Sequence, residues 1–369
     1  MPNTENNSQL LGRLREDMPG FISDQFYALD PKKYYIRSIF IPESFFVNLE
    51  RNVIAAEGNV GKARLYSIGK RYGYRLASFN KFPKGNVNKV TLTAIYQFFE
   101  IAYAKKMSTL FLDLGNKSIQ MSGEDFIIIS SGSNGFLDPV GCWAGIWAYL
   151  NNDYSLEACL AKVGSNRCDI VSGSIEFLQS KGLEPIKCDL LPRKIDFALY
   201  MKNNKAQATS TKSTATFKKL FDNEYVYYRP GKVILNGSKE RMIPSEASKL
   251  YEIEQSISSE IVFNSAYAPF YEIGSLAEEK TPADDFLCDL LSGLGFGIVN
   301  ISSSENHVNV TINGYPWFEV GAEMTNFAYI NGAVCGFLSG SSAKSYKSEN
   351  ISVRHANNAF IISMNITQS

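Results

Sequence analysis

The sequence predicts an α+β fold built from two repeated domains, each an antiparallel sheet packed against helices. Three patterns predict it: apolar residues at helical spacing, short β-branched or aromatic runs bounded by turn residues, and the same order of elements in both halves of the chain. The chain has 369 residues, which is more than one hydrophobic core usually supports. We therefore expect at least two cores.

In the first half, the order of elements is helix, helix, hairpin, helix, hairpin. Gly69 and Gly73 leave a notch in the first helix, where another element can approach closely. The third helix is rich in small and aromatic residues. The expected elements are, in order, 60–76, 90–106, 109–114 with 125–130, 140–151, and 156–162 with 168–171.

The second half repeats this order with little sequence identity to the first. Its first helix carries Gly274 where the first half has Gly69 or Gly73, and its third helix carries Cys335 and Gly336. The expected elements are, in order, 266–279, 283–294, 298–302 with 307–312, 326–339, and 351–355 with 359–365.

These patterns divide the chain into four parts. Residues 1–55 are expected to form an N-terminal extension with helical stretches near 10–15 and 42–52. Residues 56–200 form the first domain and 241–369 the second. Residues 201–240 between them are expected to be a linker, because their first part is polar and low in complexity.

Composition excludes several classes of protein. The 37 basic and 37 acidic residues cancel, so no overall field attracts nucleic acid or an anionic membrane. No stretch approaches eighteen uninterrupted apolar residues, and the polar N-terminus lacks the pattern of a signal peptide. We therefore expect a cytoplasmic protein that neither spans a membrane nor binds nucleic acid.

Catalytic motifs are also missing from the sequence. With only His307 and His355, a histidine-based triad or metal centre has little to work with. The glycines of 293–297 follow a helix and precede a strand, the reverse of a dinucleotide fingerprint, and 130–135 lacks the Lys-Ser/Thr of a phosphate loop. The sequence therefore argues against an enzyme more than for one.

Three segments resemble the 4-vinyl reductase domain family: Leu-Tyr-Ser-Ile-Gly-Lys-Arg-Tyr-Gly at 65–73, Cys-Trp-Ala-Gly at 142–145, and 157–168 with its two cysteines. The resemblance covers residues 60–175, and more weakly 255–366. It implies tandem copies of a fold that binds small hydrophobic or aromatic molecules, commonly dimerises through helices, and is related to subunits of the TRAPP tethering complex.

The same resemblance implies a zinc site, because the phenol sensors of this family hold zinc with three cysteines and a glutamate. The matching positions here are Cys142, Cys159 and Cys168, with Glu157 as the nearest acid, since position 156 is Leu156. The alternative is that the thiols are buried without a metal. The second domain keeps only one cysteine of the set and is expected to be metal-free.

Six aromatic residues come from elements that the family fold gathers around its cavity. They are candidates for a ligand pocket, and the competing interpretation is that they fill a core. They are Phe98, Tyr103, Phe126, Phe136, Trp143 and Trp147.

The sequence therefore predicts a non-catalytic sensing or scaffold protein for a small hydrophobic or aromatic ligand, with its two copies packed as an internal pseudo-dimer. A protein partner or self-association is expected to pass on the signal. The first alternative is an interaction subunit of a larger assembly, using the fold as TRAPP subunits do. The second is a reductase or substrate carrier for a tetrapyrrole.

Overall fold

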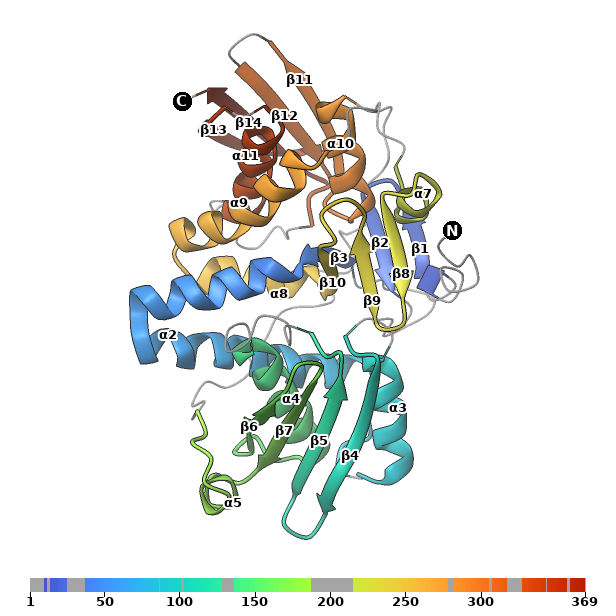
Figure 1. Ribbon diagram of the computed structural model, residues 1–369, viewed down its shortest axis with the longest axis vertical. Helices are drawn as coiled ribbons and strands as arrows, with labels where there is room; N and C mark the ends of the chain where they lie inside the picture. The colour runs from blue at the N-terminus through green and yellow to red at the C-terminus, as the bar shows by residue number, and fades with distance from the viewer. Residues whose placement is uncertain are drawn as a thin grey trace.

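A computed structural model shows an α+β architecture of three antiparallel sheets packed against helices, as the sequence predicts (Figure 1). One four-stranded sheet lies at each end of the molecule, and a six-stranded sheet lies between them. The structure describes residues 10–11, 14–24, 37–85, 87–100, 103–127, 136–186, 215–277, 282–304, 307–316, 327–342, 344–356 and 359–368.

The first half folds in the expected order. Its four-stranded sheet has the strand order β4-β5-β7-β6, and α2, α3 and α4 pack beside it. Its elements are β3 (Arg37–Pro42), α2 (Glu43–Phe79), α3 (Lys89–Phe99), β4 (Lys106–Asp113), β5 (Ser118–Glu124), α4 (Leu137–Leu150), β6 (Glu157–Val163), β7 (Arg167–Gly173) and α5 (Ile175–Ser180).

The second half repeats this series, and its sheet has the order β11-β12-β14-β13. Two successive helices, α8 and α9, stand where the first half has α2. Its elements are β10 (Arg241–Glu246), α8 (Ala247–Ser256), α9 (Ser259–Ser275), α10 (Ala283–Gly293), β11 (Ile298–Ser303), β12 (His307–Asn313), α11 (Ala328–Ser342), β13 (Tyr346–Ala356) and β14 (Ala359–Gln368).

The six-stranded sheet joins the two halves, and its strand order is β1-β2-β3-β10-β9-β8. Each half gives it a hairpin and the strand that leads into its long helix. At the centre β3 pairs antiparallel with β10, with Phe40 opposite Pro244. The remaining strands are β1 (Leu14–Met18), β2 (Phe21–Asp24), β8 (Val226–Arg229) and β9 (Lys232–Leu235), and α7 (Phe217–Asp222) precedes β8.

Glycines let the long helix of each half pack directly against its small-residue helix. A Cβ atom on Gly73 would lie 1.9 Å from the carbonyl oxygen of Cys142, and one on Gly145 would lie 2.0 Å from that of Lys70. The predicted notch is therefore confirmed as the contact between α2 and α4. In the second half, Gly274 lies against Phe337 in the same way.

A sharp bend divides α2 into two arms that run side by side (Figure 1). Gly58 has φ 58° and ψ −130° at this point, a conformation that glycine adopts without steric cost. The second arm packs on α4, and its Arg71 and Arg75 pair with Glu252 of α8. In the second half, the break between α8 and α9 takes the place of this bend.

Several expectations at the edges of the domains were wrong. Residues 14–18 form β1, not a helix, and 217–240 contribute α7, β8 and β9 where a linker was expected, while 203–214 lie outside the described residues. The expected boundary at residue 56 falls within α2. The second strand of the first hairpin is 118–124, because its Ser and Gly residues concealed a buried strand, and 125–127 are irregular.

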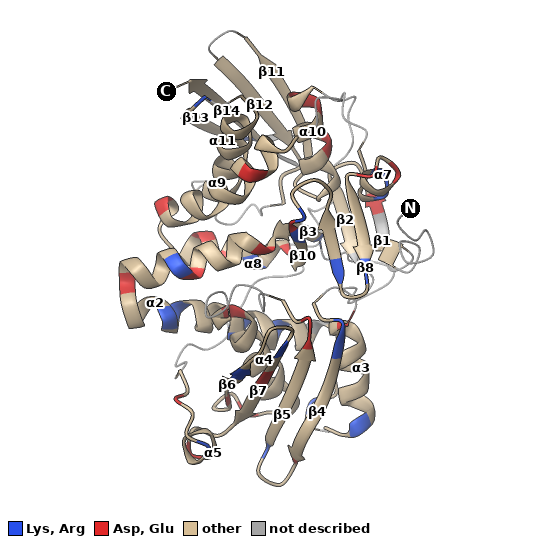
Figure 2. Cartoon of the chain, in the orientation of Figure 1, with Lys and Arg blue, Asp and Glu red and all other residues tan. Residues whose placement is uncertain are grey.

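Charge and length also bear on the class of protein. The acidic residues of α2 all precede its bend, and the basic residues after the bend include Arg71 and Arg75, which pair with Glu252 of α8 (Figure 2). In the part of the chain that the structure describes, no helix combines the length and hydrophobicity needed to cross a membrane.

Candidate functional site

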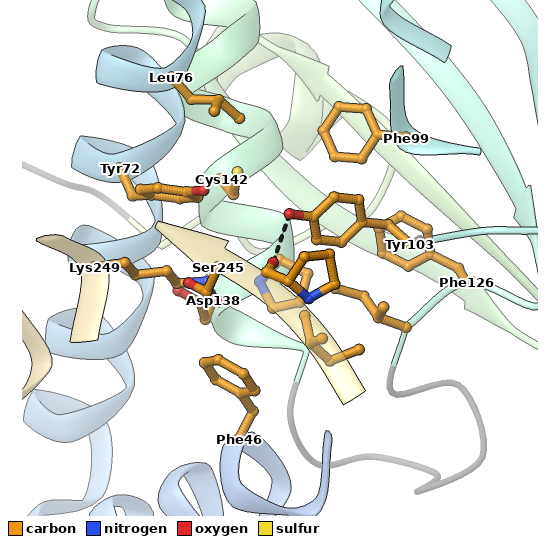
Figure 3. A pocket seen from close by; sticks show the side chains of 14 residues that line it. Phe46, Tyr72, Leu76, Phe99, Tyr103, Phe126, Asp138, Cys142, Ser245 and Lys249 are labelled. Carbon is orange, nitrogen blue, oxygen red and sulfur yellow. Dashed lines mark hydrogen bonds and ion pairs between the residues drawn. The ribbon is translucent and has the colours of Figure 1, made fainter. Parts of the chain in front are cut away.

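A small cavity lies where the two halves meet (Figure 3). The first half contributes α2, α4 and the residues around Tyr103, and the second half closes the cavity with β10 and α8. Its volume is about 30 Å³, which is room for one or two water molecules. Its walls are mostly aromatic and aliphatic, and they are formed by Phe46, Tyr72, Leu76, Phe99, Tyr103, Phe126, Ile127, Asp138, Pro139, Cys142, Ile243, Pro244, Ser245 and Lys249.

One ion pair crosses the cavity wall from half to half. The Nζ atom of Lys249 on α8 lies 2.5 Å from Oδ2 of Asp138 on α4. The lysine is also placed over two rings, 4.9 Å from the centroids of both Phe46 and Tyr72. Both charged residues are buried, with 8% and 9% of their surface exposed. The carboxylate thus compensates a cation that would otherwise be costly to bury.

Of the two carboxylate oxygens of Asp138, one has a hydrogen-bond partner among the described residues. Its Oδ2 atom accepts the bond from Lys249, whereas Oδ1 is buried without a hydrogen-bond partner among the described residues. Buried polar atoms nearly always have a partner, so an unpaired acceptor in a cavity wall indicates a place for a donor. A water molecule or a ligand group could supply it.

A second polar contact joins the two halves at the opposite wall of the cavity. The hydroxyl of Tyr103 donates to the carbonyl of Pro244 on β10 at 2.7 Å, as the dashed line in Figure 3 shows. This bond joins the first half to the second across the cavity. Cys142 lies between the two polar contacts, and burial raises the pKa of its thiol to about 12, so it forms a neutral wall.

The six aromatic candidates are divided between the cavity and the core. Tyr103 and Phe126 line the cavity. Phe98 packs behind Tyr103, with ring centroids 6.3 Å apart. The other three candidates, Phe136, Trp143 and Trp147, are buried in the hydrophobic core away from the cavity lining.

Sequence reasoning missed the part of the site that comes from the second half. Ile243, Pro244, Ser245 and Lys249 are about a hundred residues from α4 in the chain, and no local pattern connects them to it. One feature that links the two strands is present in the sequence: β3 and β10 both begin with arginine, and each precedes a helix.

The residues proposed to hold zinc do not converge. Cys159 lies opposite Val171 on the β6–β7 pair and packs with Leu178 in a small separate cluster. Cys168 is three residues before Val171 on β7, so its side chain points to the other face of the sheet. Cys142 lies on α4 at the cavity. Among the described residues, no group of three or more His, Cys, Asp and Glu side chains is arranged to hold a metal.

Glu157, the fourth proposed ligand, is already neutralised by a lysine. One carboxylate oxygen lies 2.7 Å from Nζ of Lys70, and the other accepts a 2.7 Å bond from the Tyr66 hydroxyl. All three side chains are buried, and burial followed by the nearby Glu157 charge raises the pKa of Tyr66 well above its usual value. The carboxylate therefore serves an internal ion pair, and the zinc set does not fit this structure.

Comparisons with known proteins give distant structural similarity alone. No known family model matches the chain, and no curated protein matches its sequence. Among solved structures, the phenol-responsive sensory domain of the transcription activator PoxR, crystallised with phenol, aligns with a TM-score of 0.34 and 14% identity. The alignment covers 47% of this chain and 90% of that one.

Proposed function

We propose that the protein binds a small apolar or aromatic molecule in the cavity between its halves and senses it through a change in how the halves meet. The observation that carries the proposal is the composition of the cavity wall: aromatic and aliphatic side chains surround one buried ion pair, Asp138–Lys249. Pockets for small organic molecules combine an apolar lining with a few polar groups in this way.

The size of the cavity makes binding a conformational event. Its volume of about 30 Å³ is far below that of an engineered cavity that holds benzene, about 150 Å³. A ring-sized ligand must therefore displace lining side chains. Because Tyr103 and Lys249 link one half to the other, moving either changes the contact between the halves. A ligand thus selects an open arrangement, which is what a sensor requires.

Enlarging the cavity tests the proposal. Leu76 is 2% exposed and lines the cavity, so Leu76→Ala creates room for a ring without displacing other side chains. Saturation-transfer NMR with phenol, aniline and toluene should detect binding to the wild-type chain, and Leu76→Ala should bind about tenfold tighter, a gain of about 1.4 kcal/mol. Leu178→Ala is the matched control, because it opens the separate small core instead.

The proposal fails if none of the three compounds binds to either the wild-type chain or Leu76→Ala. It also fails if Leu178→Ala tightens binding as much as Leu76→Ala does, because the compounds would then occupy any void in the protein. Both variants should be compared at equal folded fraction, since a Leu→Ala change in a core costs about 2–5 kcal/mol.

One surface favours a second function, that of an interaction subunit. The edge strand β4 exposes Leu110 and Phe111, and Leu114 follows it; these side chains are 46%, 43% and 48% exposed. An apolar edge strand can pair with another chain. If it mediates self-association, light scattering after size exclusion should show an oligomer that Leu110→Lys disperses. A monomer at all concentrations would exclude self-association through this edge.

A further inference from the structure

The two halves are related by an approximate twofold axis through the β3–β10 pair. Phe40 and Pro244 lie opposite each other and are each three residues before the long helix that follows their strand. Each strand begins with a buried arginine: Arg37 donates to the carbonyl of Gly20 at 2.5 Å, and Arg241 donates to that of Gly231 at 2.8 Å. Both glycines lie in the turn of the hairpin belonging to the same half.

The helices obey the same relation. Glu50, on the first arm of α2, accepts a 2.8 Å bond from the amide of Leu137 at the start of α4. Glu254 on α8 accepts a 2.8 Å bond from the amide of Tyr329 at the start of α11. Glu50 follows Arg37 by as many residues as Glu254 follows Arg241. Residues of the first arm of α2 therefore have defined counterparts on α8.

The glycine contacts fix the counterparts on the other helices. Gly73 lies against the carbonyl of Cys142, and Gly274 against that of Phe337. Gly145 lies against Lys70, and Gly340 against Tyr271, with the same spacing in both halves. Cys142 of α4 therefore corresponds to Phe337 of α11. Four residues before each of these lie Asp138 and Ala333, whereas the amide contacts of Leu137 and Tyr329 pair Asp138 with Ile330; both of these α11 residues are buried and apolar.

This relation predicts a second junction, where α11 meets the first arm of α2, and its side chains differ from those of the cavity. The counterpart of Lys249 is Phe45, and that of Asp138 is Ile330 by the amide contacts or Ala333 by the glycine contacts. All three are fully buried. The ring of Phe45 packs edge-on against Tyr329, with centroids 4.9 Å apart.

Both members of the ion pair are thus absent together from the second junction. Replacing one alone would leave a buried charge without compensation, which costs about 3–5 kcal/mol. Replacing both by apolar groups gives an ordinary core, and buried ion pairs are seldom more stable than such a core. Stability alone therefore does not explain why the first junction keeps Lys249 and Asp138, whose Oδ1 atom lacks a partner.

Taking the proposed ligand site as given, we infer that the described part of the chain has one such site, completed by Lys249 of the second half, and that Phe45 and the apolar residues at the start of α11 fill its counterpart. The ligand it fits is a small ring carrying one hydrogen-bond donor, amine or hydroxyl, for the free Oδ1 atom of Asp138. Lys249 binds the Oδ2 atom of the same carboxylate and leaves Oδ1 for that bond.

Two isosteric probes test this inference: 4-fluoroaniline, which carries a donor, and 4-fluorotoluene, which does not. Fluorine NMR titration of the full chain measures affinity and stoichiometry. We expect one molecule per chain and about tenfold tighter binding of the aniline, the value of one net hydrogen bond. Asp138→Ala should remove the preference. Asp138→Ala with Lys249→Phe, which copies the second junction, should abolish binding of both probes.

Phe45→Leu is the matched control, because it changes the equivalent position at the filled junction and should leave the stoichiometry and the preference unchanged. Circular dichroism checks that each variant is folded; if Asp138→Ala, which leaves Lys249 without its carboxylate, is not, the double variant alone decides. Two molecules per wild-type chain, or an unchanged preference in Asp138→Ala, would overturn the inference while the binding function stands. If neither probe binds to the wild-type chain, the proposed function fails with it.

Discussion

The close contact between α2 and α4 gives the sharpest test of the packing. Gly73→Ala adds a single methyl group at a position where a Cβ would lie 1.9 Å from the carbonyl oxygen of Cys142 and 2.6 Å from its carbon. The obstacle is helix backbone, which cannot turn aside as a flexible side chain can. The two helices must therefore move apart, and the contacts along both must loosen.

The magnitude follows from two opposing effects. Alanine favours the helical backbone over glycine by about 1 kcal/mol, so at an unobstructed helix position this change is stabilising. Here the methyl group would be about 1.5 Å inside an ordinary contact distance. Overpacking a core costs about 1–3 kcal/mol and occasionally more. We expect a net loss of about 2 kcal/mol, opposite in sign to the propensity.

Urea unfolding followed by circular dichroism measures this loss as a lower midpoint at unchanged slope. Gly164→Ala is the control, because a Cβ there would meet nothing closer than 3.5 Å; it should be neutral or slightly stabilising. If Gly73→Ala raises the midpoint as a free helix position would, the helices are not in backbone contact at this point and the described packing is wrong.

Three further predictions concern buried polar groups. Burial raises the pKa of Glu240 to about 7, so folding takes up a proton between pH 4.5 and 7. The free energy of unfolding should therefore fall by about 2–3 kcal/mol as the pH rises through that window. Glu240→Gln should flatten this dependence in a pH series of urea melts. Arg241→Met should cost about 2–4 kcal/mol by thermal unfolding, because it leaves the carbonyl of Gly231 without its buried donor, whereas the exposed Arg229→Met should cost little. Trp147→Phe should cost about 1 kcal/mol more than Trp143→Phe in urea midpoint measurements, because only Trp147 donates its indole hydrogen, to Lys117 at 2.8 Å; equal losses would contradict this.

The sequence predicted the repeated elements well because each has a strong local pattern. The helices over 137–150 and 283–293 and the hairpin over 298–313 lie within a few residues of their expected positions. Apolar periodicity and turn residues are local properties, so they can be read without knowledge of the tertiary structure. The glycine notch was predicted for the same reason.

The pairing at the centre of the six-stranded sheet could not be predicted, because β3 and β10 lack a strand pattern. β3 and β10 are buried along their whole length, so their residues do not alternate between apolar and polar. Each contains an arginine and a proline, which count against a strand in sequence. Their partners lie two hundred residues away, and pairing at that separation leaves no trace in the local sequence. The side of the cavity that the second half contributes was missed with them.

The described residues do not support the predicted zinc site, and the sequence marked the weak point of that prediction. The three cysteines match in type, but Leu156 stands where the family has its glutamate. In the structure, the neighbouring Glu157 is paired with Lys70, a residue whose role no spacing of cysteines reveals. An ammonium group in place of a metal ion compensates the same buried carboxylate without needing thiolates, and the cysteines are then free to pack as small apolar side chains.

A tandem chain permits a difference between its two junctions that a homodimer does not. In a homodimer, each position occurs twice, so a lysine at one junction is necessarily present at the other. Here Lys249 and Phe45 are separate residues and can diverge, as can Asp138 and its apolar counterpart on α11. One junction can then be specialised for a ligand at some cost in stability, while the other contributes an apolar core that offsets it. Joining the copies in one chain thus makes a one-sided site possible while the twofold framework is kept.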